Sequence, residues 1–456
     1  MRALMFGLTA GLGWRYMVWR ITETVPAFGL TADAIAGWMF VGLEFLAMVS
    51  GTLGQFILSR RKERHEEATR HANWWGDNPP PRVDLYIATY NEELEVLERT
   101  LAGTQALDYP NLHVFVLDDG RRDWLADLCK RYGAEHRTRP DNSHAKAGNI
   151  NYTLRQRLNE PDAPDFIAVL DADFVPHTNF IRRAIALFHD PGVGLVQTPQ
   201  HFFNPDPIQH NLGISQAYPD EQRFFFDHLQ SSRDAWGIAI CCGTSSMTRA
   251  KAIREIGGLP TQSVTEDFLL TIRLDANGYR TVYLNEPLTE GLAPEGVQEY
   301  IVQRARWCLG MMEIVRNVYN PFGAHNLRFM QRLSLLDSTL FWSTSFLFRL
   351  VCLICPLLYW YFGIIVVEAA PTDIVWYYAP YYAAVLIGMN WASGGLVWPV
   401  LSDVFQLLAA WPITKAVAMG LLTKGPHKFR VTAKGGDRTK TVVQWPIMKP
   451  SRSSLH

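Results

Sequence analysis

The chain has 456 residues, which is too long for one small domain and long enough for two or three. Its formal net charge is −1, so the chain lacks the strong basic field that attracts nucleic acid, and we expect no nucleic-acid partner. Hydrophobic residues make up 48% of the chain and aromatic residues 12%, which is high for a soluble enzyme and indicates membrane segments.

The apolar residues are clustered in a few stretches. Residues 4–19 form a short stretch that Arg15 interrupts, and because no small-residue cleavage site follows it, we expect a membrane helix and not a signal peptide. Three longer stretches, at about 1.5 Å of helix per residue, could each cross ~30 Å of hydrocarbon. They are residues 37–58, 341–367 and 374–398.

Basic residues follow the first of these long stretches, at Arg60, Arg61, Lys62 and Arg64. Lys and Arg are enriched on the cytoplasmic side of membrane helices, so this end is predicted to be cytoplasmic. The long polar region that follows, about residues 65–330, would then be cytoplasmic as well.

Three apolar strands are predicted in this polar region, and each ends in polar residues. The first, "VDLYIATYNE", ends at Thr89 to Glu92, and the next two end at Asp118-Asp119-Gly120 and Asp171-Ala172-Asp173. Apolar strands that alternate with helical patterns favour an open parallel α/β sheet. In such sheets ligands bind at the carboxyl ends of the strands, so we expect the three polar tips to converge in one crevice.

The acidic tips have alternative explanations. Asp118 and Gly120 also suit a simple β-turn. Asp171 and Asp173 alternate along an extended chain and can point the same way, as two oxygen ligands of Mg²⁺ or Mn²⁺ would. A lone Asp-x-Asp, however, occurs by chance in many proteins.

Two further segments carry candidate chemistry. Lys146, in "HAKAGNIN", is predicted at a helix start where it could reach a phosphate, and the alternative is a solvated lysine. Thr265-Glu266-Asp267 precedes an apolar run, and Ser263 and Glu266 have the spacing of a capping box. A helix cap would not explain Asp267, which could serve as a general base.

The stretch "IVQRARWCLG" contains Gln303, Arg304, Arg306 and Trp307. It predicts either a basic interfacial helix that rests on phospholipid or a site that binds a diphosphate and stacks a sugar. Residues 401–422 are apolar but contain Asp403, Gln406 and Lys415, which favours an interfacial helix over a spanning one.

The order of these motifs resembles the family 2 inverting glycosyltransferases, and among them the processive membrane β-glucan synthases of the bacterial cellulose synthase and curdlan synthase type. The resemblance covers nearly the whole chain and includes the segments "QTPQHFFNPDPIQHNL", "CCGTSS", "GLAPEG" and "FRVTAKG". It implies a GT-A-type open mixed α/β sheet, inserted as a cytoplasmic domain between transmembrane helices.

The resemblance also implies residue roles. Thr89, Glu92, Asp118, Lys146, Asp171, Gln303 and Arg306 would bind the UDP-sugar, and Asp171 and Asp173 would hold Mg²⁺ or Mn²⁺. Asp267 would be the general base, with Glu266 and Arg306 as further catalytic residues. Trp307, Cys242 and Gly243 would contact the acceptor sugar. The residues of the gating loop would be Phe429, Val431, Thr432 and Lys434; a basic tether to anionic lipid is the alternative for this segment.

Four regions are expected: N-terminal transmembrane helices (1–64), a cytoplasmic GT-A domain (65–320), interfacial and transmembrane helices that form a glycan channel (321–424), and a gating loop with the C-terminal segment (425–456). The implied function is processive synthesis of a linear β-glucan, β-1,4 or β-1,3, from UDP-glucose, with export across the inner membrane as a multi-pass protein. The implied partners are UDP-glucose, the growing glucan, the lipid bilayer and, for export, accessory subunits.

Several departures keep the product open. The interval between Asp118 and Asp171 lacks an insertion common in bacterial cellulose synthases, and Ile240-Cys241 stands where they usually have two phenylalanines. Mixed-linkage, hyaluronan and chitin synthases remain alternatives, as does a transporter or a catalytically inactive scaffold. A transporter would place its polar residues at the membrane midplane, whereas here they lie in the large polar region.

Overall fold

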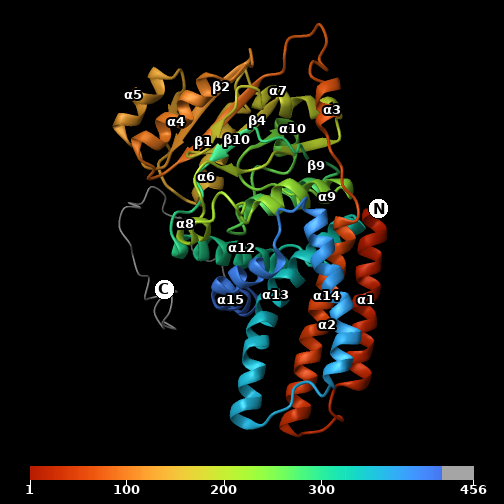
Figure 1. Ribbon diagram of the computed structural model, residues 1–456. Helices are drawn as coiled ribbons and strands as arrows, with labels where there is room; N and C mark the ends of the chain where they lie inside the picture. Colours follow the sequence, from red (N-terminus) through yellow and green to blue (C-terminus); the bar gives the residue numbers. More distant parts are fainter. Residues whose placement is uncertain (324, 424–456) are drawn as a thin grey trace.

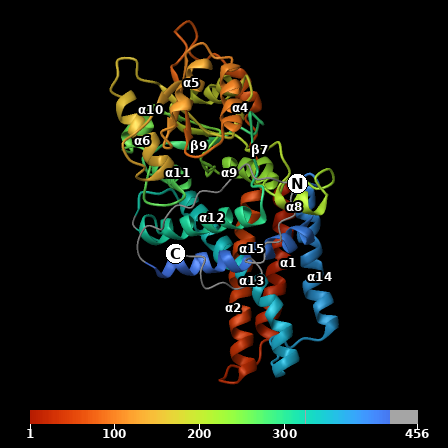
Figure 2. The ribbon, with the colours of Figure 1, turned by 90° about the vertical axis from the view of Figure 1, so that its left-hand side faces the viewer.

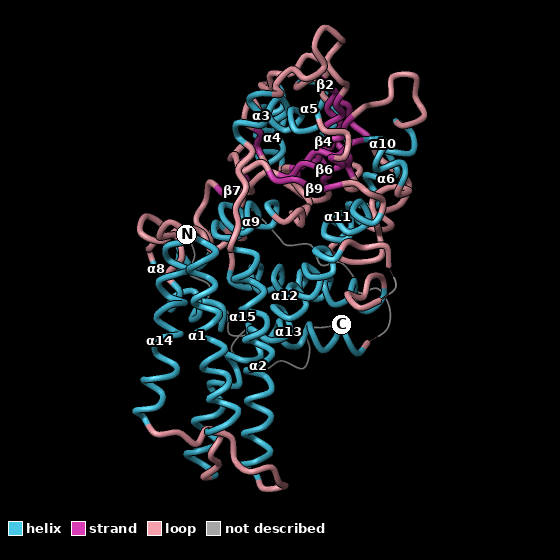
Figure 3. Tube along the Cα trace, turned by 90° about the vertical axis from the view of Figure 1, so that its right-hand side faces the viewer, coloured by secondary structure: helices cyan, strands magenta, loops and turns pink. Residues whose placement is uncertain are grey.

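The computed structural model describes residues 1–323 and 325–423. Figure 1 shows a sheet-containing domain above a bundle of long helices, with the N-terminus where the two parts meet. The strands are confined to the upper part in Figure 3, and the lower part is entirely helical.

The main sheet has seven strands in the order β3-β2-β1-β4-β8-β6-β9. β8 is antiparallel to both β4 and β6, and the other pairings are parallel. The mixed GT-A-type sheet implied by the resemblance is therefore confirmed, while the all-parallel sheet suggested by the strand–helix pattern is wrong at β8. The seven strands are β1 (Val83–Thr89), β2 (Leu112–Asp118), β3 (Glu135–Arg137), β4 (Phe166–Asp171), β6 (Val193–Gln197), β8 (Ser246–Arg249) and β9 (Arg280–Tyr283).

A small second sheet has the order β5-β10-β7. Its strands are β5 (Val175–Pro176), β10 (Thr289–Gly291) and β7 (His201–Phe202). The helices of this domain are α3 (His65–Arg70), α4 (Leu94–Gln105), α5 (Asp123–Arg131), α6 (Ala145–Arg157), α7 (Phe180–Ile185), the 3-10 turn η1 (Ala186–His189), α8 (Pro207–Leu212), the π-turn η2 (Phe225–Leu229), α9 (Gln230–Ala235), α10 (Ala250–Glu255) and α11 (Glu266–Ala276).

Both faces of the sheet are buried. Along β1, Leu85 and Ile87 belong to one hydrophobic cluster, while the intervening Tyr86 belongs to another. β4 does the same, with Ala168 in the first cluster and Val169 in the second. Strands covered on both faces are continuously apolar, and this is why their polar ends were conspicuous in the sequence.

Four helices form the bundle: α1 (Arg2–Glu23), α2 (Ala32–Leu58), α13 (Phe329–Phe362) and α14 (Pro371–Ala392). α2 packs between α1 and α13, and α14 packs against α1 (Figure 1). Large apolar side chains remain exposed on its surface, among them Leu353, Trp360 and Trp376, at 57%, 73% and 70%. An apolar outer surface of this kind suits contact with lipid.

A layer of two helices separates the bundle from the sheet domain. α12 (Val297–Asn317) and α15 (Pro399–Leu422) pack along each other and run across the direction of the bundle (Figure 2). By length and composition α2, α13 and α15 are the described helices that could each cross a membrane, whereas α1 and α14, for which we expected membrane helices, are not among them. The interfacial placement of α15 stays a prediction, and its orientation across the bundle accords with it.

The basic residues after α2 contact helix α9 of the sheet domain. Arg64 pairs with Asp234 of α9 at 2.5 Å, and the Lys62 backbone N–H donates to the carbonyl of Ser231. On the same helix, Arg233 pairs with Asp337 of α13 at 2.7 Å. Adjacent residues of α9 therefore attach to the segment that follows α2 and to α13 of the bundle.

A buried ion pair under the sheet provides a stability test. Arg157 of α6 donates to Asp84 of β1 at 2.8 Å, and the two side chains are only 3% and 0% exposed. Asp84→Asn removes the buried partner of Arg157 and leaves the guanidinium with Glu160 and Asp162, whose side chains are 36% and 45% exposed. Because these partners compensate in part, we expect a cost of about 3 kcal/mol, the low end for a broken buried pair. We expect the thermal midpoint of the detergent-solubilised protein, followed by size-exclusion after heating, to fall by at least about 5 °C.

The control is Glu98→Gln, which removes an exposed pair with Arg131 at 3.5 Å. Because exposed pairs contribute little, its midpoint should stay close to that of the unchanged protein. Equal midpoints for the two variants would contradict the importance of the Asp84 pair.

Candidate active site

Three neighbouring strands bring the predicted polar tips together. In the register of the sheet, Thr89 at the end of β1 lies beside Asp118 at the end of β2. On the other side, Ala88 lies beside Asp171 at the end of β4. The predicted convergence at the carboxyl edge is therefore confirmed for these three strands.

Arg122 joins the first two tips, and sequence reasoning missed it. Its guanidinium donates to the Thr89 hydroxyl at 2.7 Å and pairs with Asp118 at 3.0 Å. Thr89 in turn donates to Glu92 at 2.6 Å. Burial would raise the pKa of Asp118, but hydrogen bonds from His136 and Arg122 lower it to about 2. Asp118 is thus a fixed anion, and the only advance signal for Arg122 was its position four residues after Asp118.

Lys146 lies at the centre of the site. It is in the first turn of α6, and its ammonium pairs with Asp171 at 2.5 Å and donates to the carbonyl of Gly243 at 2.6 Å. Burial alone would lower the pKa of Lys146, but the Asp171 carboxylate keeps it above its ordinary value. The lysine is therefore charged, and the alternative of a freely solvated lysine is wrong.

The loop that contains Gly243 is held in place by side chains from the end of β6 and just beyond it. Gln197 accepts from the backbone N–H of Cys242 at 2.8 Å, and Gln200 donates to the Cys242 carbonyl at 2.8 Å. The hydroxyl of Thr244 accepts from the backbone of Asp171 at 2.8 Å. The segments "QTPQ" and "CCGTSS" thus form one support beneath Lys146 and Asp171.

Asp267 lies against this loop. Gly243 has a φ of +84°, and a Cβ placed there would lie 3.0 Å from Oδ2 of Asp267. A side chain at this position would therefore be strained and would crowd the carboxylate. Gly243, predicted for the acceptor side, and Asp267, the predicted base, therefore lie together in the structure.

Glu266 and Asp267 open α11, but no capping box forms there. The residue before the helix is Thr265, without a side-chain cap, and the Ser263 hydroxyl instead donates to the Gly310 carbonyl of α12 at 3.0 Å. A Cβ at Gly310 would lie 2.4 Å from the Thr265 hydroxyl oxygen. The start of α11 is therefore pressed onto α12, which explains why the capping-box interpretation is wrong.

The two acids are half-buried and lie among other charged groups. Burial, reinforced by the Asp267 carboxylate, raises the pKa of Glu266. Burial also raises the pKa of Asp267, although Lys146 and Arg306 act in the opposite direction. Burial lowers the pKa of Arg306, whose charge interacts with Glu266, Asp267 and Asp171. Five of the predicted charged residues therefore form one cluster: Lys146, Asp171, Glu266, Asp267 and Arg306.

α12 supplies the remaining predicted residues. Gln303, Arg306 and Trp307 are three and four residues apart, so they share one side of the helix. The Gln303 Oε1 atom is buried and has no hydrogen-bond partner among the described residues, as expected of a group that awaits a ligand. Trp307 is half-buried, and the Arg304 guanidinium lies 5.1 Å from its ring centre.

The predicted metal ligands differ in their surroundings. The Asp171 side chain is 38% exposed, while Asp173 is buried and accepts from the backbone of Leu292 at 3.3 Å. Among the described residues no group of three or more His, Cys, Asp or Glu side chains is placed to hold a metal ion. The predicted gating residues Phe429, Val431, Thr432 and Lys434 lie outside the described residues.

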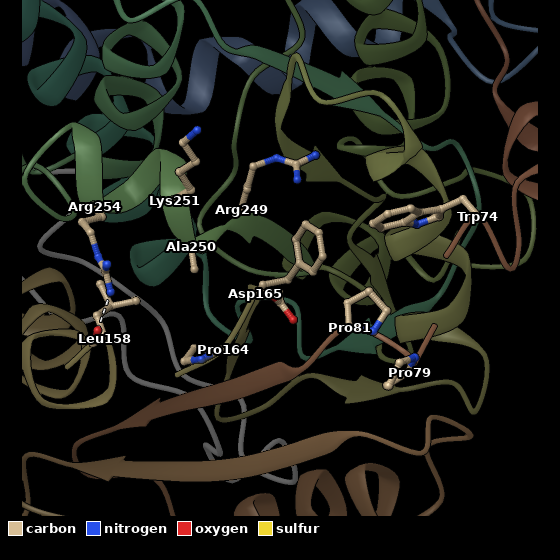
Figure 4. Close-up of a pocket in the computed structure, with 11 residues that line it drawn as sticks. Trp74, Pro79, Pro81, Leu158, Pro164, Asp165, Arg249, Ala250, Lys251 and Arg254 are labelled. Carbon is tan, nitrogen blue, oxygen red and sulfur yellow. Dashed lines mark hydrogen bonds between the residues drawn. The ribbon is translucent and has the colours of Figure 1, made fainter. Parts of the chain in front are cut away.

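A pocket of about 460 Å³ lies elsewhere in the domain (Figure 4). It is lined by Trp74, Phe166 and Arg249, among others, and Phe166 is the first residue of β4, whereas Asp171 is the last. Five residues of strand separate the pocket from the charged cluster by ~16 Å. The pocket is therefore at the amino edge of the sheet, away from the predicted site.

Comparisons with known proteins identify the family and the fold of the chain. The family described as "Glycosyltransferase like family 2" matches residues 80–310, and the family described as "Cellulose synthase" matches residues 239–396. Among solved structures, a mannosyltransferase from Pyrobaculum calidifontis, in complex with GDP-Man and Mn²⁺, shares the fold with a TM-score of 0.52 and 17% identity. That likeness covers 83% of this chain and 99% of the mannosyltransferase.

Bacterial relatives match over almost the whole chain. A cellulose synthase catalytic subunit from Pseudomonas fluorescens is 34% identical over 452 residues, which are 98% of this chain and 59% of the relative. A second, from Komagataeibacter xylinus, is 34% identical over 436 residues, 94% of this chain and 56% of that protein. The chain thus spans less than two thirds of the length of these relatives. The match over residues 80–310, which contain every charged group of the cluster, shows that this chain belongs to the family 2 glycosyltransferases.

Proposed function

We propose that this chain is the catalytic part of a processive β-glucan synthase that uses UDP-glucose and releases UDP. One observation carries the proposal: a half-buried carboxylate, Asp267, lies within electrostatic reach of two cations, Lys146 and Arg306, next to the helix layer that leads to the bundle. The similarity to cellulose synthase catalytic subunits described as UDP-forming supports this donor and product class.

Inverting glycosyl transfer is a single displacement at the anomeric carbon of the donor sugar. The acceptor hydroxyl forms the new C–O bond, its proton passes to a base, and the bond to the UDP oxygen breaks. Asp267 is the proposed base, since its raised pKa makes it a better proton acceptor than an ordinary aspartate. Glu266 beside it adds negative charge, which favours uptake of a proton by the pair as a unit.

The leaving diphosphate gains negative charge as the bond breaks. Lys146 and Arg306 are the proposed partners of that charge, and preorganised cations in a buried site are usually the largest catalytic contribution. In the free protein Lys146 is paired with Asp171, so the bound nucleotide would compete for a cation that is already in position.

Asp171 and Asp173 are the proposed ligands of a divalent cation. Both are hard oxygen donors at the end of β4, which suits Mg²⁺ or Mn²⁺, and diphosphate oxygens would complete the ligand set. When bound, the cation would neutralise charge on the diphosphate.

Thr89, Glu92 and Asp118 are the proposed wall of the uridine pocket, with Arg122 as the residue that holds their geometry. Trp307, Cys242 and Gly243 are the proposed acceptor side. The exposed apolar bundle and the layer of α12 and α15 below the site support delivery of the product into a bilayer. We place the protein in the inner membrane, with the sheet domain in the cytoplasm.

The product identifies the activity most directly. We expect membranes that contain the protein to incorporate labelled glucose from UDP-glucose into an insoluble polymer and to release one UDP for each glucose incorporated. Digestion by a β-1,4-glucanase would assign the cellulose-like linkage, and digestion by a β-1,3-glucanase the curdlan-like one. No polymer from UDP-glucose, or polymer only from another UDP-sugar, would overturn the proposed donor.

Asp267→Asn keeps the shape of the side chain and removes the base. We expect glucan synthesis to fall by about 10²–10⁴-fold, while binding of UDP, measured by calorimetric titration, stays nearly unchanged. Asp127→Asn, at an exposed carboxylate on α5, is the control and should retain full synthesis. Near-normal turnover in the Asp267 variant would remove this residue from the chemistry.

Synthesis should also require a divalent cation. We expect excess EDTA to reduce incorporation to background and added Mg²⁺ or Mn²⁺ to restore it, because the proposed ligands are two carboxylates. The thermal midpoint of the nucleotide-free protein should not change with EDTA, because the cation would bind together with the diphosphate. Undiminished synthesis in EDTA would contradict a role for the cation.

A further inference from the structure

Trp307 belongs to two rows of side chains on α12. It lies four residues after Gln303, which faces the charged cluster, and three residues after Arg304. Arg304 itself lies four residues after Tyr300. Side chains three and four residues apart are neighbours on a helix, so Trp307 is the point at which the site meets a second group of residues.

This second group consists of Tyr300, Arg304 and Glu221. The Arg304 guanidinium lies 4.8 Å from the ring centre of Tyr300 and 5.1 Å from that of Trp307. Glu221 accepts from Arg304 at 2.9 Å and from the Tyr300 hydroxyl. The Arg304 and Glu221 side chains are only 16% and 15% exposed, so solvent screens this pair weakly.

Glu221 is itself fixed from outside α12. Three residues before it, the carbonyl of Tyr218 accepts from the side chain of Gln209 in α8 at 2.7 Å. The Tyr218 hydroxyl is hydrogen-bonded to Ser402 of α15 at 3.0 Å. The segment that presents Glu221 is therefore attached to both α8 and α15, and it cannot easily follow a movement of Arg304.

We propose that Glu221 and Arg304 form a positioning pair that fixes the indole ring of Trp307 for the acceptor sugar. The proposal rests on the function proposed above, because it takes Trp307 as the platform for the end of the growing glucan. Neither Glu221 nor Arg304 is proposed to touch the reacting atoms.

The pair can fix the indole ring because the Arg304 guanidinium lies against the rings of Tyr300 and Trp307. A guanidinium above an aromatic ring is attracted to it, and the attraction is strongest where water is excluded. The Arg304 Nε atom is buried without a hydrogen-bond partner among the described residues. The position of the guanidinium group therefore depends on the contact of its Nη2 atom with Glu221. Loss of the carboxylate leaves a buried cation that must move to find a new partner, and the indole ring then loses its support.

A Trp307 ring that is loosely held should impair use of the acceptor sugar and leave nucleotide binding unchanged. With Glu221→Gln we expect the ratio of glucose incorporated to UDP released to fall about tenfold, because a desolvated cation–π contact is worth roughly one factor of ten. The missing glucose should appear as free sugar from hydrolysis of the donor. The mean chain length should shorten, and calorimetric affinity for UDP should stay within about twofold of the unchanged protein.

Arg304→Lys is the second variant. It keeps the charge next to Glu221 but loses the planar group that stacks on the indole ring, so the same loss of incorporation is expected in a protein that retains an ion pair. The matched control is Glu286→Gln, because Glu286 also pairs with an arginine, Arg183, and their side chains are similarly buried at 13% and 16%. That pair is remote from α12, so Glu286→Gln should leave the ratio unchanged.

A double-variant cycle decides whether the pair acts through Trp307. In a Trp307→Phe background, Glu221→Gln should have almost no further effect on the ratio, because residues that act as one unit are not additive. Additive effects, or a Glu221→Gln protein that behaves like Glu286→Gln, would overturn the positioning pair. If Trp307→Ala itself leaves the ratio and the chain length unchanged, the acceptor role in the proposed function fails instead, and the two failures are thereby distinguished.

Discussion

The contact of Lys146 with Asp171 and Gly243 is the interaction on which the site depends. Asp171 ends a central strand, Gly243 belongs to the loop before β8, and Lys146 begins α6. One ammonium therefore joins three separate parts of the sheet domain at its carboxyl edge. Because that loop also lies against Asp267, the lysine links the strand that would bind the donor to the helix that carries the proposed base.

The two acids at the start of α11 lie among like and opposite charges. The charges of Lys146 and Arg306 lower the pKa values of Glu266 and Asp267. Burial outweighs these cations, and the Asp267 carboxylate adds to the effect at Glu266, so the pKa values of both acids are raised. A raised pKa suits a carboxylate that is proposed to accept a proton.

The sequence made the carboxyl edge predictable because apolar strands ended abruptly in acids. Position at a strand end is a local property, and the register of β1, β2 and β4 then brought Thr89, Asp118 and Asp171 together. The direction of β8 could not be predicted this way, since a short apolar strand looks the same in either direction. The capping box failed for a related reason: Ser263 had a suitable partner three residues ahead, but α12 offered its hydroxyl a tertiary one.

The same limit explains the residues that sequence reasoning missed. Arg122 and Glu221 lie in turns and loops without a periodic pattern, and each matters through a partner that folding supplies. Glu221 is 83 positions from Arg304, so no spacing rule could have paired them. The resemblance identified the groups expected to touch substrate, whereas the groups that hold these in place became visible only from the contacts of the folded chain.

α12 connects the proposed active site to the helices of the bundle. One of its sides faces the charged cluster through Gln303 and Arg306, and its length packs against α15, which lies across the bundle. The two interpretations of "IVQRARWCLG", an interfacial helix and a binding site, are therefore compatible, because a helix can face lipid on one side and the proposed site on the other. Since Gly310 of the same helix presses on Thr265, a shift of α12 relative to the bundle would displace Asp267 as well. The position of the proposed base is thus tied to the helix layer through which a growing chain would have to pass.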